Sequence, residues 1–154
     1  MFRSGQFVAD HLGTIRDDQP QPNGVDLTLD SVFEQISTGS IERDGKTVGE
    51  RREVETTDGQ YHLSPGGYIV QYGEVIRIPE DHIGFLYPRS SLLRNSCMLN
   101  TAVWDAGYEG RGEGLLQVHH DIRLEPGARI AQLVFAEAAH DGQYDGSYQG
   151  ENVE

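Results

Sequence analysis

Short apolar runs that end at turn-forming residues constrain this chain most strongly. Glycine and proline separate the runs at places such as Ser64-Pro65-Gly66-Gly67 and Glu125-Pro126-Gly127. The runs are rich in β-branched and aromatic residues and read GYIVQYGEVIRI (67–78), HIGFLYP (82–88), GEGLLQVHH (112–120) and ARIAQLVFAEA (128–138). Apolar segments of this length between turn signals are typical of β-strands. The sequence therefore predicts a mainly all-β domain.

Residues 6–17 depart from this pattern. Val8, Leu12 and Ile15 recur there at helical spacing. Gly13 lies inside the segment and weakens a helix interior. We therefore expect one short N-terminal helix.

Two further segments have little to bury. Residues 38–60 mix both charge signs, which predicts a hairpin or a mobile surface excursion without evident chemistry. Residues 140–154 (HDGQYDGSYQGENVE) are rich in glycine and aspartate. Such termini are commonly poorly ordered when free. We expect a β domain over residues 1–139 and a flexible tail over residues 140–154.

Charge limits the partners of the chain. It has 25 acidic and 12 basic residues, for a net charge of −13, and Lys46 is the only lysine. This bias favours the surface of a halophile over that of an ordinary acidic cytosolic protein. Nucleic-acid phosphates would be repelled, so we expect no nucleic-acid partner. If the chain handles phosphates, its arginines must be concentrated in a pocket.

The compartment follows from cysteine usage and hydropathy. Cys97 is the only cysteine, which excludes an internal disulfide framework and fits a reducing compartment. No window approaches the roughly 18 apolar residues of a membrane span, and the N-terminus lacks a signal peptide. We expect a cytoplasmic protein without a membrane partner.

Two segments could carry chemistry. In PRSSLLRNS (88–96), Arg89 can bind phosphate in a bidentate way, and the adjacent serines offer hydroxyl and backbone N–H donors. In NTAVWDAGYEGR (100–111), Asp105 follows an apolar strand and could orient a water as a general base. Tyr108 could lie against a sugar or base, or simply pack in the core. These residue types alone indicate a phosphate-handling pocket.

The order of the motifs adds a family. PNGVDL (22–27), PRSSL (88–92), TAVWDAGYEGR (101–111) and PGARIAQLVF (126–135) resemble the successive motifs of the dUTPase/dCTP deaminase superfamily. The resemblance covers nearly the whole chain. It implies a dUTPase-like distorted jelly roll, or β-clip, with one short N-terminal helix. It also implies a homotrimer with active sites at subunit interfaces, Mg²⁺ as cofactor and dUTP as substrate.

The resemblance also implies roles for residues that hold the triphosphate. Arg89, Ser90 and Ser91 match the motif that binds it, and Gln132 matches a glutamine that also contacts phosphates. Asp26 would help to shape the metal and phosphate surroundings indirectly.

The remaining roles concern the nucleoside and the water. The segment Asn100-Thr101-Ala102-Val103 matches a hairpin whose backbone reads the pyrimidine edge. Asp105 matches the aspartate that contacts the 3′-hydroxyl and positions the attacking water, and Tyr108 matches the aromatic residue beneath the sugar. Tyr148 and Gln149 would belong to a tail that closes over bound nucleotide as a lid.

Two branches of the superfamily share these motifs. Deaminases that resemble this chain place a glutamate after the Gly-Tyr-x-Gly turn, and its position here falls on Gln117 if two extra residues lie in the turn. An amide cannot take up a proton at neutral pH, so we predict a dUTP diphosphatase. If Glu113 faced the base instead, a monofunctional or bifunctional dCTP deaminase would return. The layout before residue 27 and the tail sequence Ser147-Tyr148-Gln149-Gly150 do look more like those of deaminases.

A regulator that only binds nucleotide is a second alternative. Such a protein would not need a carboxylate that positions water. Because Asp105 is present with the other motif residues, this interpretation ranks last.

Overall fold

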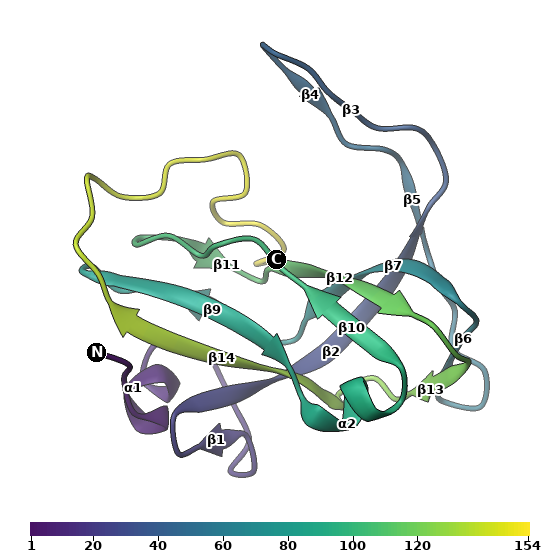
Figure 1. Ribbon diagram of the computed structural model, residues 1–154, viewed down its shortest axis with the longest axis horizontal. Coiled ribbons are helices and arrows are strands. Elements are labelled where there is room, and N and C mark those ends of the chain that lie inside the picture. The colour runs from purple at the N-terminus through teal and green to yellow at the C-terminus, as the bar shows by residue number, and fades with distance from the viewer.

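One long strand, β2 (Gly24–Gln35), organises this computed structural model, which describes residues 1–154. Its first half pairs with β14 (Arg129–Glu137), and its second half pairs with β7 (Gly66–Tyr72) and β5 (Arg51–Glu53). The register shifts between Leu29 and Ser31. An irregularity of this kind bends a strand and increases its twist. β2 therefore passes from one part of the sheet to the other (Figure 1).

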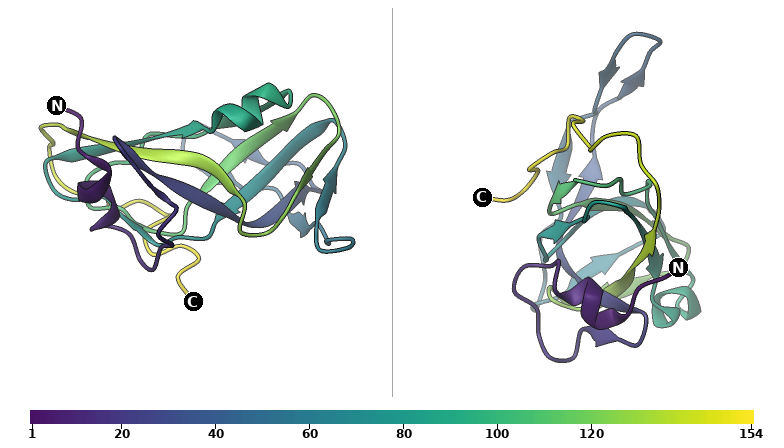
Figure 2. Two further views of the ribbon diagram at one scale, coloured as in Figure 1. Left: turned by 90° about the horizontal axis from the view of Figure 1, so that it is seen from below. Right: turned by 90° about the vertical axis from the view of Figure 1, so that its left-hand side faces the viewer.

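The main sheet has the order β10-β12-β7-β2-β14-β9, and β1 and β5 add to β2. The members not yet introduced are β1 (Pro20–Gln21), β9 (His82–Pro88), β10 (Cys97–Asn100) and β12 (Glu113–Val118). The sheet curls into an almost closed barrel in the end-on view (Figure 2, right). The expected all-β architecture is thus confirmed.

Three short pairs complete the strands. They are β11 (Glu109–Gly110) with β8 (Ile76–Arg77), β13 (Ile122–Leu124) with β6 (Tyr61–Leu63), and β3 (Ser40–Ile41) with β4 (Lys46–Thr47). The last pair lies at the end of an arm that projects from the body (Figure 1). We define this arm as residues 36–50. A hairpin was one of the two forms expected for this polar region.

The core lies inside the curled sheet. On β7 the side chains of Tyr68, Val70 and Tyr72 are buried in alternation with less buried neighbours. Leu116 and Val118 on β12 follow the same period. A period of two places one face of a strand against the core. The apolar runs of the sequence thus lie where their alternation predicts.

The N-terminal helix is shorter than its sequence pattern. α1 (Gly5–Ala9) begins after Ser4, whose hydroxyl accepts a hydrogen bond from the Phe7 N–H at 3.3 Å. Beyond the helix, Leu12 forms a β-bridge to Ile76 instead of continuing the helix. Pairing with β8 therefore overrides the helical spacing of residues 6–17.

A second helix was not expected. α2 (Ser90–Arg94) follows β9 directly, and Arg89 is its N-cap residue. Neither α1 nor α2 is long and apolar enough to cross a membrane.

Candidate active site

A cavity of about 340 Å³ lies between the turn after β10, the C-terminal tail and the arm. It gathers the predicted residues Ala102, Val103, Asp105, Tyr108 and Tyr148. The rest of its wall comes from Val48, Trp104, Glu113, Tyr144 and Glu151. The wall is therefore mainly apolar and aromatic, with a few carboxylates.

A tight turn presents Asp105 at this cavity. The Tyr108 N–H donates to the Asp105 carbonyl oxygen at 3.2 Å, and Gly107 between them has φ of 85°. A positive φ of this size favours glycine. The Asp105 side chain is exposed at the wall. A carboxylate in this position can reach a water molecule in the cavity.

Trp104 anchors the turn to β9. Its backbone exchanges two hydrogen bonds with Gly84, at 2.9 and 3.3 Å. A Cβ atom at position 112 would lie only 2.0 Å from the Trp104 ring, so the ring needs the glycine there. Trp104 is buried, and it also lines the cavity.

Tyr108 is buried in an aromatic cluster. Its ring meets Trp104 and Tyr144 edge to face, at centroid distances of 5.1 and 5.6 Å. Its hydroxyl donates to Glu151 Oε1 at 2.7 Å. Burial, together with this bond to a carboxylate, raises the pKa of Tyr108, so the hydroxyl stays protonated as a donor. The predicted contact with a sugar remains a prediction.

A neighbouring cavity of about 350 Å³ is lined by Asn100, Thr101 and Ala102. It shares Ala102 and Glu113 with the first cavity. The segment 100–103 therefore lies along both cavities, and its predicted contact with a pyrimidine remains a prediction.

Gln117 and Glu113 are the two β12 residues considered for the position of the deaminase glutamate, and their surroundings differ. The Gln117 Oε1 accepts a hydrogen bond from Asn100 Nδ2 at 2.9 Å. Glu113 lines both cavities, but Arg51 binds its carboxylate in a bidentate way at 2.6 and 2.7 Å. The side chain beside Asn100 is thus an amide, and the acid in the wall already has a cationic partner.

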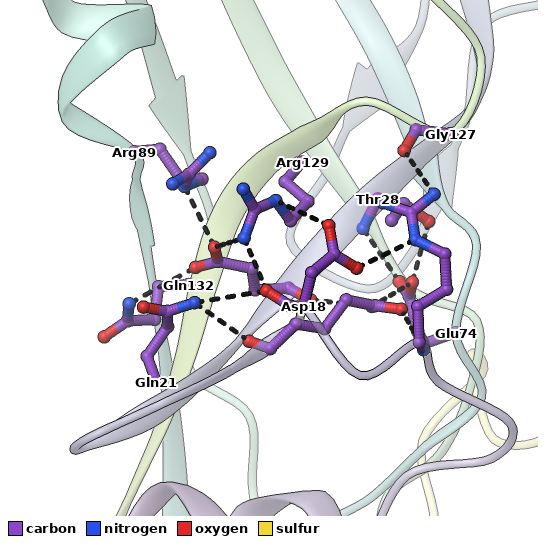
Figure 3. A network of polar contacts seen from close by, with 11 residues as sticks. Asp18, Gln21, Thr28, Glu74, Arg89, Gly127, Arg129 and Gln132 are labelled. Carbon is purple, nitrogen blue, oxygen red and sulfur yellow. Dashed lines mark hydrogen bonds and ion pairs between the residues drawn. The ribbon is translucent and has the colours of Figure 1, made fainter.

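A second polar group forms around Asp26, whose side chain is fully buried. Its Oδ2 lies 3.0 Å from Arg89 Nε and 3.3 Å from Arg129 Nη1. Its Oδ1 accepts from Gln132 Nε2 at 3.3 Å. Figure 3 shows Arg129 and Gln132 of β14 and Arg89 at the start of α2 converging on this carboxylate.

Glu74 provides a second buried carboxylate, which Gln19 links to the Asp26 backbone. Gln19 Nε2 donates to the Asp26 carbonyl at 2.8 Å and to Glu74 Oε1 at 2.7 Å. Glu74 also accepts from the Thr28 N–H and hydroxyl, at 2.9 and 2.7 Å. Each polar group of this buried network thus has a partner, which the low local dielectric demands.

The chain contains no group of three or more His, Cys, Asp or Glu side chains that could hold a metal ion. Asp26 was predicted to act on a metal indirectly. Both its oxygens already accept hydrogen bonds from arginine or glutamine side chains. The arginine and glutamine side chains of this group are hydrogen-bond donors. They therefore suit the binding of an anion.

Ser90 and Ser91 lie in the first turn of α2 and are exposed. The first N–H groups of a helix have no acceptor inside the helix. The two serines and Arg89 can therefore direct hydroxyl, amide and guanidinium donors outwards from one turn of chain.

The predicted residues thus form two groups. None of Arg89, Ser90, Ser91 and Gln132 lines the cavity that contains Asp105. The two groups belong to different parts of the chain surface.

The tail folds back onto its own chain. The Glu109 N–H donates to Gln149 Oε1 at 3.0 Å, and Gln149 Nε2 donates to the Gly107 carbonyl at 2.9 Å. Asn152 Nδ2 donates to the Arg111 carbonyl at 3.0 Å. Gln149 therefore holds the tail against the turn and does not line the cavity.

Several site residues escaped the sequence prediction. Arg129 lies within the quoted PGARIAQLVF motif but was not selected. Tyr144 and Glu151 lie in a tail that carries no apolar pattern, and Val48 lies in the arm. Only Arg129 had a signal in the sequence that could have identified it.

The family described as dCTP deaminase-like matches residues 2–138. A probable deoxyuridine 5′-triphosphate nucleotidohydrolase of Halobacterium salinarum is 58% identical to the chain, covering 100% of the chain and 97% of the relative. A protein of the same designation from Aeropyrum pernix is 43% identical, covering 99% and 100%.

Solved structures agree in fold. The 2′-deoxycytidine 5′-triphosphate deaminase of Agrobacterium tumefaciens has a TM-score of 0.65 at 21% identity, over 89% of this chain and 48% of that one. A D95N mutant dUTPase from phage phi11 of S. aureus, which coordinates a structural Mg(II) ion, has a TM-score of 0.54 at 12% identity, over 96% and 95%. These identities support the fold alone.

The contribution of the buried Asp26 network to stability can be tested by mutation. Asp26→Asn should lower the free energy of unfolding by about 1–3 kcal/mol, because Arg89 and Arg129 lose a buried charged acceptor. Chemical denaturation of the variant and the parent measures this difference. Asp18→Asn is the matched control, since Asp18 pairs with Arg129 at an exposed position and should change stability much less. Equal losses in the two variants would contradict a special role for Asp26.

Proposed function

The chain belongs to the dCTP deaminase-like family, and we infer that it hydrolyses dUTP to dUMP and pyrophosphate. The relatives from Halobacterium salinarum and Aeropyrum pernix support this activity across almost their whole length. One structural observation carries the choice of chemistry. Asp105 is exposed at a cavity wall, whereas the β12 side chain beside Asn100 is the amide of Gln117. The site offers a carboxylate for water and an amide where deamination would need an acid.

The charges favour one orientation of the substrate. Asp105, Glu113 and Glu151 line the cavity, and these carboxylates would repel a triphosphate. The uncharged deoxyuridine part suits the mainly apolar cavity beside residues 100–103. The triphosphate suits Arg89 and Gln132, with the serines of α2 as further donors.

We propose that Asp105 orients a water molecule and accepts its proton as the water attacks the α-phosphate. The bond between the α-phosphorus and the oxygen bridging to the β-phosphate then breaks, and pyrophosphate leaves. Arg89 and Gln132 hold the phosphate chain so that the attacked phosphorus faces the water. Tyr108 forms part of the cavity wall and is held there by its aromatic contacts.

Mg²⁺ is the cofactor of this proposal. Magnesium prefers oxygen ligands and commonly binds through substrate phosphates. Because both Asp26 oxygens bind side chains of the chain itself, Asp26 would act indirectly, by fixing Arg89. When bound, the ion would neutralise charge on the phosphate groups.

A homotrimer would join the two groups of residues. Tyr87 and Val103 are exposed by 57% and 56%, and they line an apolar hollow between β9 and β10. Exposed apolar surface of this kind is typical of contact with another subunit. We propose that Arg89, Ser90, Ser91 and Gln132 of one copy face the Asp105 cavity of the next.

The tail would act as a lid. Tyr148 lines the cavity, and Gln149 ties the tail to the turn below it. Through these contacts the closed tail would shield a bound nucleotide from bulk water. The lid function of residues 140–154 is part of the proposal.

The deaminase alternative rests on Glu113, which lines both cavities. Arg51 binds both of its oxygens, which disfavours a proton-shuttling role. A regulator that only binds nucleotide would need neither the exposed Asp105 nor a path for water.

Product analysis tests the function directly. With Mg²⁺, the protein should convert dUTP to dUMP and pyrophosphate and should release no ammonia from dCTP. Chromatography of the nucleotides and an ammonia assay give the result. Release of ammonia that disappears in Glu113→Gln would establish the deaminase alternative instead.

Removal of the proposed base tests the mechanism. Asp105→Asn should reduce kcat for dUTP by about 10²–10⁴-fold, the typical contribution of a general base, while dUTP still binds. Steady-state kinetics and equilibrium binding measure the two effects. Asp121→Asn serves as the control, since this aspartate is exposed and lies outside both cavities. Turnover near the parent value in Asp105→Asn would remove Asp105 from the mechanism.

Mixing two inactive variants tests the shared site. Arg89→Ala and Asp105→Asn should each have little activity. Their co-refolded mixture should regain about a quarter of the parent activity, because one site in four draws an intact Arg89 and an intact Asp105 from two different copies. Activity no higher than that of the separate variants would show that both residues act within one copy.

A further inference from the structure

The arm, residues 36–50, is a part of the chain that the proposed chemistry does not use. Its end carries β3 and β4, and Ile41 at this end is 95% exposed. A hairpin without a role at the cavity would not be expected to contact the cavity or the tail. Three contacts bring the arm and the strand after it to the cavity and the tail.

The first contact lies at the end of the arm. The Lys46 Nζ is 4.4 Å from the centroid of the Tyr148 ring. A lysine ammonium within about 6 Å of an aromatic face is attracted by the ring quadrupole. Lys46 is the only lysine of the chain. It contacts the tail residue that lines the cavity.

The second contact is the cavity wall itself. Val48 lines the 340 Å³ cavity together with residues of the turn after β10. Val48 is 67% exposed, so its apolar side chain has little of its own chain to pack against. A ligand in the cavity would cover part of it.

The third contact lies just past the base of the arm. Arg51 on β5 binds the Glu113 carboxylate, and Glu113 Oε1 also accepts from the tail residue Asn152 at 3.3 Å. The Arg51 guanidinium also lies 4.4 Å from the Phe33 ring of β2. The base is thus fixed to the body at the place where the tail ends.

From these contacts we propose that the arm is a wall of the substrate cavity and a latch for the tail. Val48 supplies apolar surface for the nucleoside, and Lys46 holds Tyr148 over the cavity through its ring. Lys46 is therefore a positioning residue, which acts on the substrate through the tail. This assignment rests on the proposed dUTP-binding function of the same cavity.

The expected effect follows from an exposed cation–π contact. Lys46→Ala should raise the open fraction of the tail, and with it the KM for dUTP, by about two- to fivefold, while kcat stays unchanged. Lys46→Arg should stay near the parent, because guanidinium also binds aromatic faces. Ile41→Ser is the matched control, since Ile41 belongs to the same hairpin and lines neither cavity.

Two measurements decide the matter. The first is the rate of chymotrypsin cleavage after Tyr148 without nucleotide, followed by mass spectrometry, because cleavage tracks the population of the open form. The second is the KM and kcat for dUTP. Faster cleavage and a higher KM in Lys46→Ala, but not in Lys46→Arg or Ile41→Ser, support the latch.

The latch is overturned if Lys46→Ala matches Ile41→Ser in cleavage, or if Lys46→Arg behaves like Lys46→Ala. A fall in kcat at constant KM also overturns it. The cleavage assay needs no substrate. If the parent protein fails to hydrolyse dUTP, the proposed function fails, yet the cleavage rates still decide whether Lys46 holds the tail.

Discussion

The buried carboxylate of Asp26 is the constraint on which the rest of the structure depends. Gln132 on β14 lies opposite Asp26 on one side and opposite Tyr87 on the other. This register places Arg89, two residues after Tyr87, beside the same carboxylate. A fully buried charge is costly unless it is paired and hydrogen-bonded, so Asp26 requires Arg89 and Arg129 in these positions. The pairing of three strands therefore also places the side chains that we propose to bind the phosphates.

The distribution of charge is compatible with the proposed binding of an anionic substrate by an acidic chain. The net charge of −13 is spread over the surface, whereas Arg89 and Arg129 converge at one carboxylate. The carboxylates of the cavity lie elsewhere, next to the surface that suits an uncharged nucleoside. At molar salt the Debye length is only about 3 Å, so the surface charge would be screened while a buried pair would not. The halophilic character suggested by the composition fits this arrangement and remains a prediction.

Most of the fold could be predicted because strand alternation and turn residues are local signals. The four apolar runs became β7 with β8, β9, β12 and β14. The N-terminal helix was overestimated, since Leu12 found a β partner, Ile76, far along the chain. α2 was missed because five residues carry no period. In the site, the motif residues were identifiable by resemblance. The arm contacts were not, because only the tertiary fold brings Lys46 to the tail and Val48 to the cavity.

Trp104 has a consequence for how the molecule can be observed. It is the only tryptophan, and its indole forms part of the cavity wall while Gly112 fixes its position. Ultraviolet emission excited at long wavelength therefore comes from a single known place in each copy. A base that stacks or settles nearby alters the polarity around that indole. The protein thus carries its own optical reporter of occupancy, without any attached dye.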